Sequence, residues 1–170
     1  MNRVMAILEN PLYNDYIQRI DFKEKGRPFC RHNLDHFLST ARISYILLLE
    51  NDEIDMLACR AGIPREKVKE LVYAAGLLHD IGRWKAYETG EDHARLSARY
   101  AKEILQESGY TSREIEVICQ AIMEHRGKSK HLSLLGERLH QADSFSRSCY
   151  QCSAQNECYK FNRDKYRLEY

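Results

Sequence analysis

Apolar residues recur every three or four positions through most of this chain, the spacing that places them on one face of an α-helix. Two stretches show it most clearly. Residues 34–49 carry Leu34, Phe37, Leu38, Ala41, Tyr45, Leu48 and Leu49, and residues 68–78 carry Val68, Leu71, Val72, Ala75 and Leu78. No alternation of apolar and polar residues persists, so the sequence gives no sign of a β-sheet. The pattern predicts an all-α fold built from amphipathic helices.

Capping residues and helix breakers set the boundaries of these helices. Asp92 is a plausible N-cap, and Pro64 suits the first turn of a helix. Residues 111–114 form a capping box, in which a hydroxyl and a carboxylate each satisfy the other's backbone donor. The expected helices therefore cover about residues 11–24, 32–50 with a resumption to 61, 64–78, 93–108, 112–125 and 132–142.

Size and charge limit the classes of function. The chain has 170 residues, enough for one domain with a proper core, and we expect that domain to span residues 1–147, with a tail of residues 148–170 packed on or near it. The net charge of +1 argues against a large nucleic-acid-binding surface but allows a small basic pocket for phosphate. A homodimer is an open possibility.

Location follows from what the sequence lacks. No apolar run approaches the roughly 20 residues of a membrane span, and no secretory signal is visible. A cytoplasmic protein with no membrane partner is therefore expected, and its six cysteines should be mostly reduced. Cys59 and Cys119 fall within helical patterns and are expected to fill the core.

Six histidine and aspartate residues stand out, because each can be placed on the apolar face of its own helix. Buried histidine and aspartate are costly unless they are hydrogen-bonded, paired or metal-bound. For any one residue, an ordinary role in the core or at a helix end is the simpler explanation. Together, at or near the ends of the main helices, they indicate a shared interior site. They are His36, the adjacent pair His79 and Asp80, His93, His125 and Asp143.

The mixture of imidazoles and carboxylates suits iron, manganese, zinc or nickel. A carboxylate can bridge two metals, and Asp80 is the natural bridge. Two ions about 3.5–4 Å apart can clamp both oxygens of a phosphoryl transfer. We expect two divalent transition-metal ions, with iron as the first candidate and manganese, nickel or zinc as alternatives.

These residues resemble a known family. His36, His79-Asp80 and Asp143 are similar to the H…HD…D signature of the HD-domain superfamily of metal-dependent phosphohydrolases, over about residues 32–147. The added His93 and His125 resemble the subgroup with six ligands and two metals, and within it the bacterial HD-type hydrolases that cleave diadenosine tetraphosphate symmetrically. Residues 53–64 look like extra length between the first two motifs, and the cysteine-containing tail lies outside the minimal domain.

The resemblance implies a role for each residue. His36, His79, Asp80 and Asp143 would hold one metal, and His93 and His125 the second, with Asp80 between them. A metal-bound hydroxide would attack phosphorus in a nucleotide or another small phosphate ester. Arg83 would neutralise a substrate phosphate beside the catalytic Asp80, and Arg126 and Arg147 are further candidates for binding phosphate oxygens.

Three more histidines are weighed separately. His32 lies four residues before His36, so both can share a helical face. It is either a partner of the site or a helix-start residue without a metal role. His131 and His140 are expected at the surface.

The tail contains Cys149, Cys152 and Cys158, and the first two have a spacing typical of metal ligands. A structural zinc site usually takes four ligands, and Cys30 would complete the set if the tail folds back. An iron–sulfur cluster is the rarer option. Three reduced, unligated cysteines remain the simple alternative.

Two other functions stay open at this stage. Some HD-fold proteins with the same six-ligand pattern are mixed-valence di-iron oxygenases, and the ligands alone do not separate the two chemistries. A nucleotide-binding sensor without turnover is the second alternative, although the full set of ligand types argues against a degenerate site.

Overall fold

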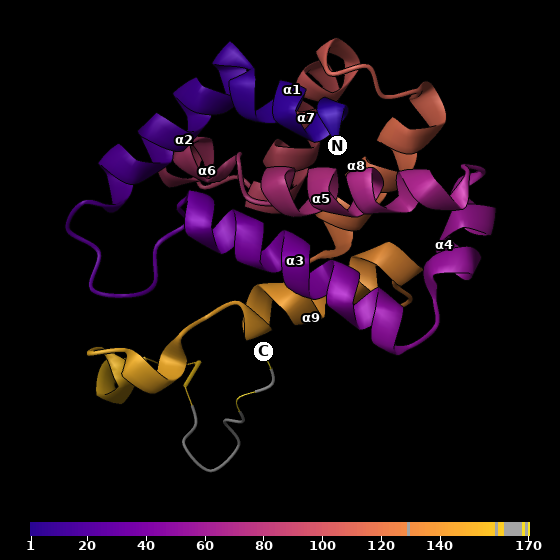
Figure 1. The fold of residues 1–170 in the computed structure, drawn as a ribbon. Helices are drawn as coiled ribbons and strands as arrows, with labels where there is room; N and C mark the ends of the chain where they lie inside the picture. Colours follow the sequence, from indigo (N-terminus) through magenta and orange to yellow (C-terminus); the bar gives the residue numbers. More distant parts are fainter. Residues whose placement is uncertain (129, 159, 162–167, 169) are drawn as a thin grey trace.

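The structure, a computed structural model, describes residues 1–128, 130–158, 160, 161, 168 and 170. The described part is helical and contains no β-strand, which confirms the all-α fold (Figure 1). The helices are α1 (Asn2–Glu9), α2 (Pro11–Glu24), α3 (Leu34–Glu50), α4 (Ile54–Ala61), α5 (Val68–Leu78), α6 (Arg83–Thr89), α7 (His93–Glu107), α8 (Ser112–Glu124) and α9 (Leu134–Phe145). Short 3-10 turns cover Arg65–Lys67, Cys149–Gln151 and Gln155–Glu157.

Helix α5 is the centre of the bundle. All of its residues except Lys69 and Tyr73 are buried, as expected of a helix surrounded by other helices. It packs against α3 and α8, and α9 packs in turn against α3 and α8. Figure 1 shows α3 and α5 running side by side, with α9 along the other side of α3. The C-terminal end of α5 therefore lies between these helices.

The contact between α3 and α5 is close enough to require glycine. A Cβ atom added to Gly76 would lie 2.5 Å from Cα of Ala41 and 2.7 Å from its backbone nitrogen. Small residues at both positions let the two backbones approach. This approach brings the first turn of α3, which carries His36, next to the end of α5, which His79 directly follows.

Several predicted boundaries are confirmed. Helix α2 has the expected bounds, and the Asn10 side chain caps it by accepting from the backbone nitrogens of Leu12 and Tyr13. Asp92 caps α7, and the capping box at the start of α8 is present. The break after residue 50 is also real, since Asp52 has a φ of 54°.

Two helices and one core residue differ from expectation. Helices α1 and α6 are not among the helices expected from the sequence. Both are short, and short helices depend on tertiary packing more than on their own sequence pattern. Helix α6, for example, buries Trp84. The prediction that Cys59 fills the core is wrong, because Cys59 is exposed. Helix α4 has only one buried face, and Cys59 lies on the other. Cys119 is buried as expected.

Tyr170, the last residue of the described tail, contacts the helical bundle. Tyr170 donates from its hydroxyl to Glu50 Oε2 at 2.6 Å, and its ring lies 5.6 Å from that of Phe145. Ala154 is the one buried residue of the described tail. Among the described residues, no helix has the length and apolar character needed to cross a membrane.

Candidate metal centre

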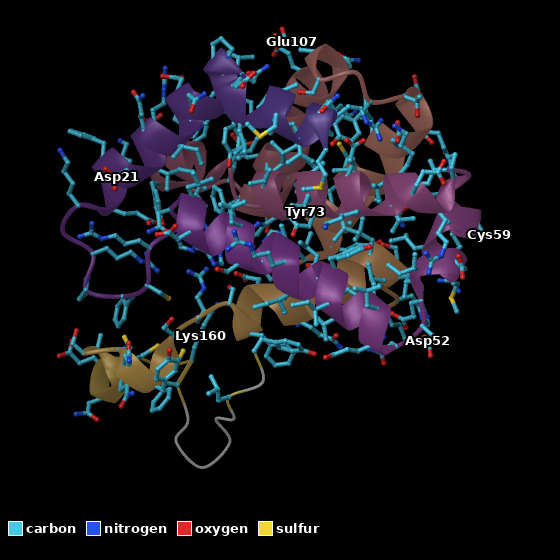
Figure 2. The ribbon with its side chains drawn as sticks, in the orientation of Figure 1. Asp21, Asp52, Cys59, Tyr73, Glu107 and Lys160 are labelled. Carbon is cyan, nitrogen blue, oxygen red and sulfur yellow. The ribbon has the colours of Figure 1, made fainter. Side chains whose placement is uncertain are left out.

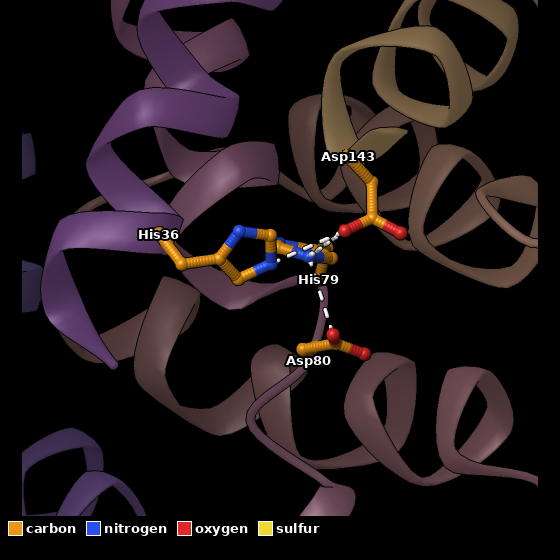
Figure 3. A group of neighbouring side chains, drawn as sticks. All are labelled: His36, His79, Asp80 and Asp143. Atoms are coloured by element: carbon orange, nitrogen blue, oxygen red, sulfur yellow. Dashed lines mark ion pairs between the residues drawn. The ribbon is translucent and has the colours of Figure 1, made fainter. Parts of the chain in front are cut away.

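The six candidate ligands come from five places in the sequence and meet at one point. His36 lies in the first turn of α3, and Asp143 lies in the last turn of α9. His79 and Asp80 directly follow α5. Figure 3 shows His36 and Asp143 approaching His79 from opposite sides, with Asp80 below it. The remaining two are His93, the first residue of α7, and His125, directly after α8.

Their ligand atoms form two groups that share Asp80. His36, His79, Asp80 and Asp143 each offer an atom within 4.8 Å of the others, and so do Asp80, His93 and His125. The residues of these two groups are the ones named from the sequence.

Asp80 lies between the groups because its two oxygens face different histidines. Oδ2 lies 3.4 Å from Nε2 of His79. Oδ1 lies 3.3 Å from Nε2 of His93 and 3.5 Å from Nε2 of His125. On the other side of the first group, Asp143 Oδ1 lies 3.2 Å from Nε2 of His36. The two oxygens of Asp80 therefore face different groups of candidate ligands.

Backbone and hydroxyl contacts orient three of the imidazoles. Nδ1 of His79 lies 2.7 Å from the carbonyl oxygen of Gly76, and Nδ1 of His125 lies 2.6 Å from that of Ile122. A carbonyl oxygen only accepts, so Nδ1 carries the proton in both rings. Nδ1 of His36 lies 3.0 Å from Ser146 Oγ. These contacts direct Nε2 of each ring into the site, the arrangement usual for metal-binding histidines.

The interior of the site contains buried polar atoms without hydrogen-bond partners. Within the described residues, these include both side-chain oxygens of Asp80 and Nε2 of His79, and both residues are fully buried. A buried carboxylate that lacks hydrogen bonds is expensive. The orphaned atoms face one another, so the donor set fits a divalent cation.

The charges of the site are strongly coupled. Burial raises the pKa of Asp80, but Arg83 and His79 outweigh it and hold the pKa well below its usual range. Burial lowers the pKa of His79, but Asp80 and Asp143 outweigh it and raise the pKa to about 9. Burial lowers the pKa of His36 and of His93 to about 3. His36, His93 and Asp80 thus already have the protonation states that metal binding requires, whereas His79 has to release a proton when an ion binds.

The three candidate arginines all lie beside the site, and two of them contact candidate ligands. Arg83 Nε lies 2.7 Å from Asp80 Oδ2 without the alignment of a hydrogen bond. Nη2 of Arg147 lies 3.1 Å from Asp143 Oδ1. Arg126 pairs with Asp92. All three arginines line one cavity of about 800 Å³ together with His93, His125 and Asp143.

Sequence reasoning missed part of the surrounding structure. Nδ1 of His32 lies 2.6 Å from Glu24 Oε1, and Nε2 lies 3.6 Å from Asp80 Oδ2. His32 is therefore a partner of the site, one of the two roles that its spacing left open. Glu24 looked like an ordinary end of α2, and only the fold brings it here.

His140 also differs from expectation. It is partly buried, lines the same cavity, and places Nδ1 2.7 Å from the carbonyl oxygen of His125. The prediction that it lies at the open surface is wrong, because the loop after α8 folds against α9. His131 is exposed, as expected.

Comparison with known proteins agrees with this geometry. The sequence profile of the HD domain matches residues 33–148, which include all six candidate ligands. The chain belongs to the HD domain family. HD domains bind divalent metals and are typical of metal-dependent hydrolases, and this HD domain contains a histidine and aspartate cluster suited to a metal.

One relative covers nearly the whole chain. An uncharacterized protein of Clostridium beijerinckii is 37% identical over 158 residues, which are 93% of this chain and 92% of the relative. No solved structure matches the chain significantly. The match to the relative extends beyond the HD domain region, but its name assigns no activity.

Proposed function

We propose that this protein is a metal-dependent phosphohydrolase that cleaves a small phosphate ester at a site holding two divalent ions. The observation that carries the proposal is the position of Asp80, which belongs to both groups of ligand atoms. Its two oxygens face separate histidines. A site for a single ion would not need a second group of imidazoles on the far side of the same carboxylate.

The ligands divide between the ions as the two groups do. His36, His79 and Asp143 would hold the first ion, and His93 and His125 the second, with Asp80 in contact with both. Iron is the first candidate, and manganese, nickel and zinc accept the same donors. When bound, such a pair supplies Lewis acidity for activating water and for polarising a phosphoryl group.

The charge of the site favours a phosphorylated substrate. Two divalent ions would exceed the charge of the two carboxylates, Asp80 and Asp143, and leave the centre positive. Arg83 and Arg147 border it and add further positive charge. Arginine forks match phosphate oxygens. Once ions balance Asp80 and Asp143, both guanidinium groups become available to a phosphate in the cavity.

The size of the cavity supports a substrate of nucleotide size. Its volume of about 800 Å³ lies within the range of small-molecule sites. Arg126 and Lys128 also line it, so positive charge continues away from the ligands. A substrate with several phosphates would use this extension. Diadenosine tetraphosphate is therefore a suitable first test substrate, beside simpler nucleotides.

Metal analysis of variants tests the two-ion site. Protein purified anaerobically is compared with the variants His93→Ala and His125→Ala, with His131→Ala as a matched control, because His131 is exposed. We expect each of the first two to lose about one ion per chain and the control to lose none. Metal content unchanged in both His93→Ala and His125→Ala would contradict the second ion.

Activity is then measured as phosphate release under anaerobic conditions with each candidate metal. Release that disappears in His93→Ala and persists in His131→Ala supports the hydrolase. Oxygen uptake that depends on reduced iron, without phosphate release, would contradict the hydrolase and indicate an oxygenase. Nucleotide binding without turnover, with both ions present, would indicate a sensor instead.

A further inference from the structure

Four of the six cysteines gather beside the metal centre, although the sequence separates them widely. Cys30 lies between α2 and α3, and the other three follow α9 in the tail. All are free thiols. They line a single cavity of about 350 Å³. These four are Cys30, Cys149, Cys152 and Cys158, and together they are called the thiol cluster here.

The three cysteines of the tail lie in, or directly after, two short 3-10 turns that form a compact backbone. The backbone nitrogen of Cys152 donates to the carbonyl oxygen of Cys149 at 3.2 Å, and that of Cys158 donates to Gln155 at 3.3 Å. The Gln155 side chain closes the two turns by donating to the Cys149 carbonyl oxygen at 2.5 Å. A two-residue gap in a tight turn is the usual way to bring two thiols to one metal ion.

This compact backbone has little apolar packing to hold it. Of the described tail residues, only Ala154 is buried. Short segments without a hydrophobic core generally need a disulfide or a metal to stay folded. No disulfide joins these thiols, so a metal ion would supply a cross-link that the segment otherwise lacks.

Contacts of the main chain bring Cys30 to the tail. Arg147 donates from Nη1 to the carbonyl oxygen of Arg31 at 3.0 Å, which ties the residue before the tail to the residue after Cys30. Arg27 donates from Nε to the carbonyl oxygen of Cys30 at 3.1 Å. Hydrogen bonds therefore hold the backbone that carries Cys30, the fourth thiol, in place.

The thiols also influence one another electrostatically. Burial raises the pKa of Cys149, and Cys30, Cys152 and Cys158 raise it further, while Arg147 acts in the opposite direction. Arg31 and Arg147 line the same cavity as the four thiols, so their positive charge would offset part of the excess negative charge of a tetrathiolate.

We propose that Cys30, Cys149, Cys152 and Cys158 bind one zinc ion as four thiolates. Each Zn–S bond replaces an S–H bond and releases one proton to water, without any change of oxidation state. Among the described residues, only the histidine and aspartate groups bring three or more ligand atoms within 4.8 Å of one another, so the four sulfur atoms do not all lie that close. Binding therefore also requires the four sulfurs to close around the ion.

The position of the cluster gives the ion a structural role at the edge of the metal centre. Its cavity is also lined by His36 and Arg147. Arg147 contacts Asp143 on one side and the backbone beside Cys30 on the other. An ion that fixes the tail would therefore hold Arg147 in place. This inference does not depend on the reaction proposed above.

Metal content and X-ray absorption test the proposal directly. We expect about one zinc ion per chain with only sulfur neighbours, at about 2.3 Å. The variants Cys149→Ser and Cys152→Ser should lose it, whereas Cys59→Ser should keep it. Cys59 is an exposed cysteine of α4, and in Figure 2 it lies at the right edge of the molecule, away from Lys160 of the tail. His93→Ala should also keep this zinc, which separates it from the ions of the histidine site.

Thiol titration of the unaltered native protein covers the case in which serine variants fail to fold. We expect a thiol reagent to modify Cys59 alone at first, because Cys119 is buried. A strong chelator should then release four more thiols. Five thiols that react without a chelator would overturn the proposal, as would zinc bound only by nitrogen and oxygen. Acid-labile sulfide would replace zinc with an iron–sulfur cluster.

Discussion

Nη2 of Arg147 lies 2.8 Å from Nε2 of His36. The low pKa of His36, about 3, keeps this imidazole neutral, so its Nε2 accepts from the guanidinium. The same nitrogen atom of Arg147 contacts Asp143. A guanidinium group thus occupies the position between two candidate ligands that a metal ion would take, and metal binding has to move it toward the cavity.

Replacing Arg147 should affect the substrate more than the metal. We expect Arg147→Ala to raise KM for a phosphate ester about tenfold to a hundredfold, the range for losing a hydrogen bond to a charged group. Its metal content should stay unchanged, because no ligand is lost. Steady-state kinetics and metal analysis measure the two effects. Arg42→Ala serves as the control, because Arg42 is exposed on α3. Loss of metal with unchanged KM would contradict this role.

The contact of Gly76 with Ala41 predicts a cost in stability. The added methyl group of Gly76→Ala meets the backbone of α3 at 2.5 Å, and backbone cannot move aside as a flexible side chain can. Overpacking of this kind costs about 1–3 kcal/mol. We expect a clear fall in Tm and a weaker metal site, since His36 and His79 lie at the ends of these helices. Gly26→Ala is the control, because nothing lies within 4 Å of its added atom. Equal Tm values would refute the close approach.

Glu114 should make the protein more stable above pH 4.5 than below it. Burial raises its pKa, but the backbone of Thr111 and the side chain of Arg3 lower it below the ordinary value of 4.5. A carboxyl whose pKa is lower in the folded state stabilises the fold above its unfolded pKa, and this contribution is lost as the pH falls through the folded value.

Thermal unfolding of Glu114→Gln at several pH values measures this contribution. Glutamine keeps the cap but loses the ionic contact with Arg3, whose Nη1 lies 2.9 Å from the carboxylate. We expect a lower Tm at pH 7, and a difference from the native protein that shrinks below pH 4.5. Glu116→Gln, in the same helix, is the control because its ion pair with Arg113 is exposed. A difference that stays constant with pH would count against the ionic origin.

The sequence predicted most of the bundle and the set of candidate ligands for the same reason. Helical periodicity identified α3 and α5, and the same phase put His36 and His79 on buried faces. Both are local signals. The helix α6 and the role of Glu24 have no local signal, because they depend on packing between distant parts of the chain. Cys59 shows the opposite error, since a helical pattern alone does not say which face of a short helix is covered.

His32 should tune the metal centre through Asp80. Its ring lies between Glu24 and Asp80, with Nδ1 2.6 Å from the first and Nε2 3.6 Å from the second, and it is buried. Groups that orient metal ligands typically change metal affinity or activity by about 10–100-fold when removed. We expect His32→Gln to weaken metal binding to that extent, as measured by competition with a chelating dye. Tyr87→Phe is the matched control, because it removes the 2.5 Å hydrogen bond from Tyr87 to Glu24 and a long 3.5 Å contact with Arg27, and leaves Asp80 untouched. A folded His32→Gln protein with native metal affinity would show that His32 serves only as a partner of Glu24 at the end of α2.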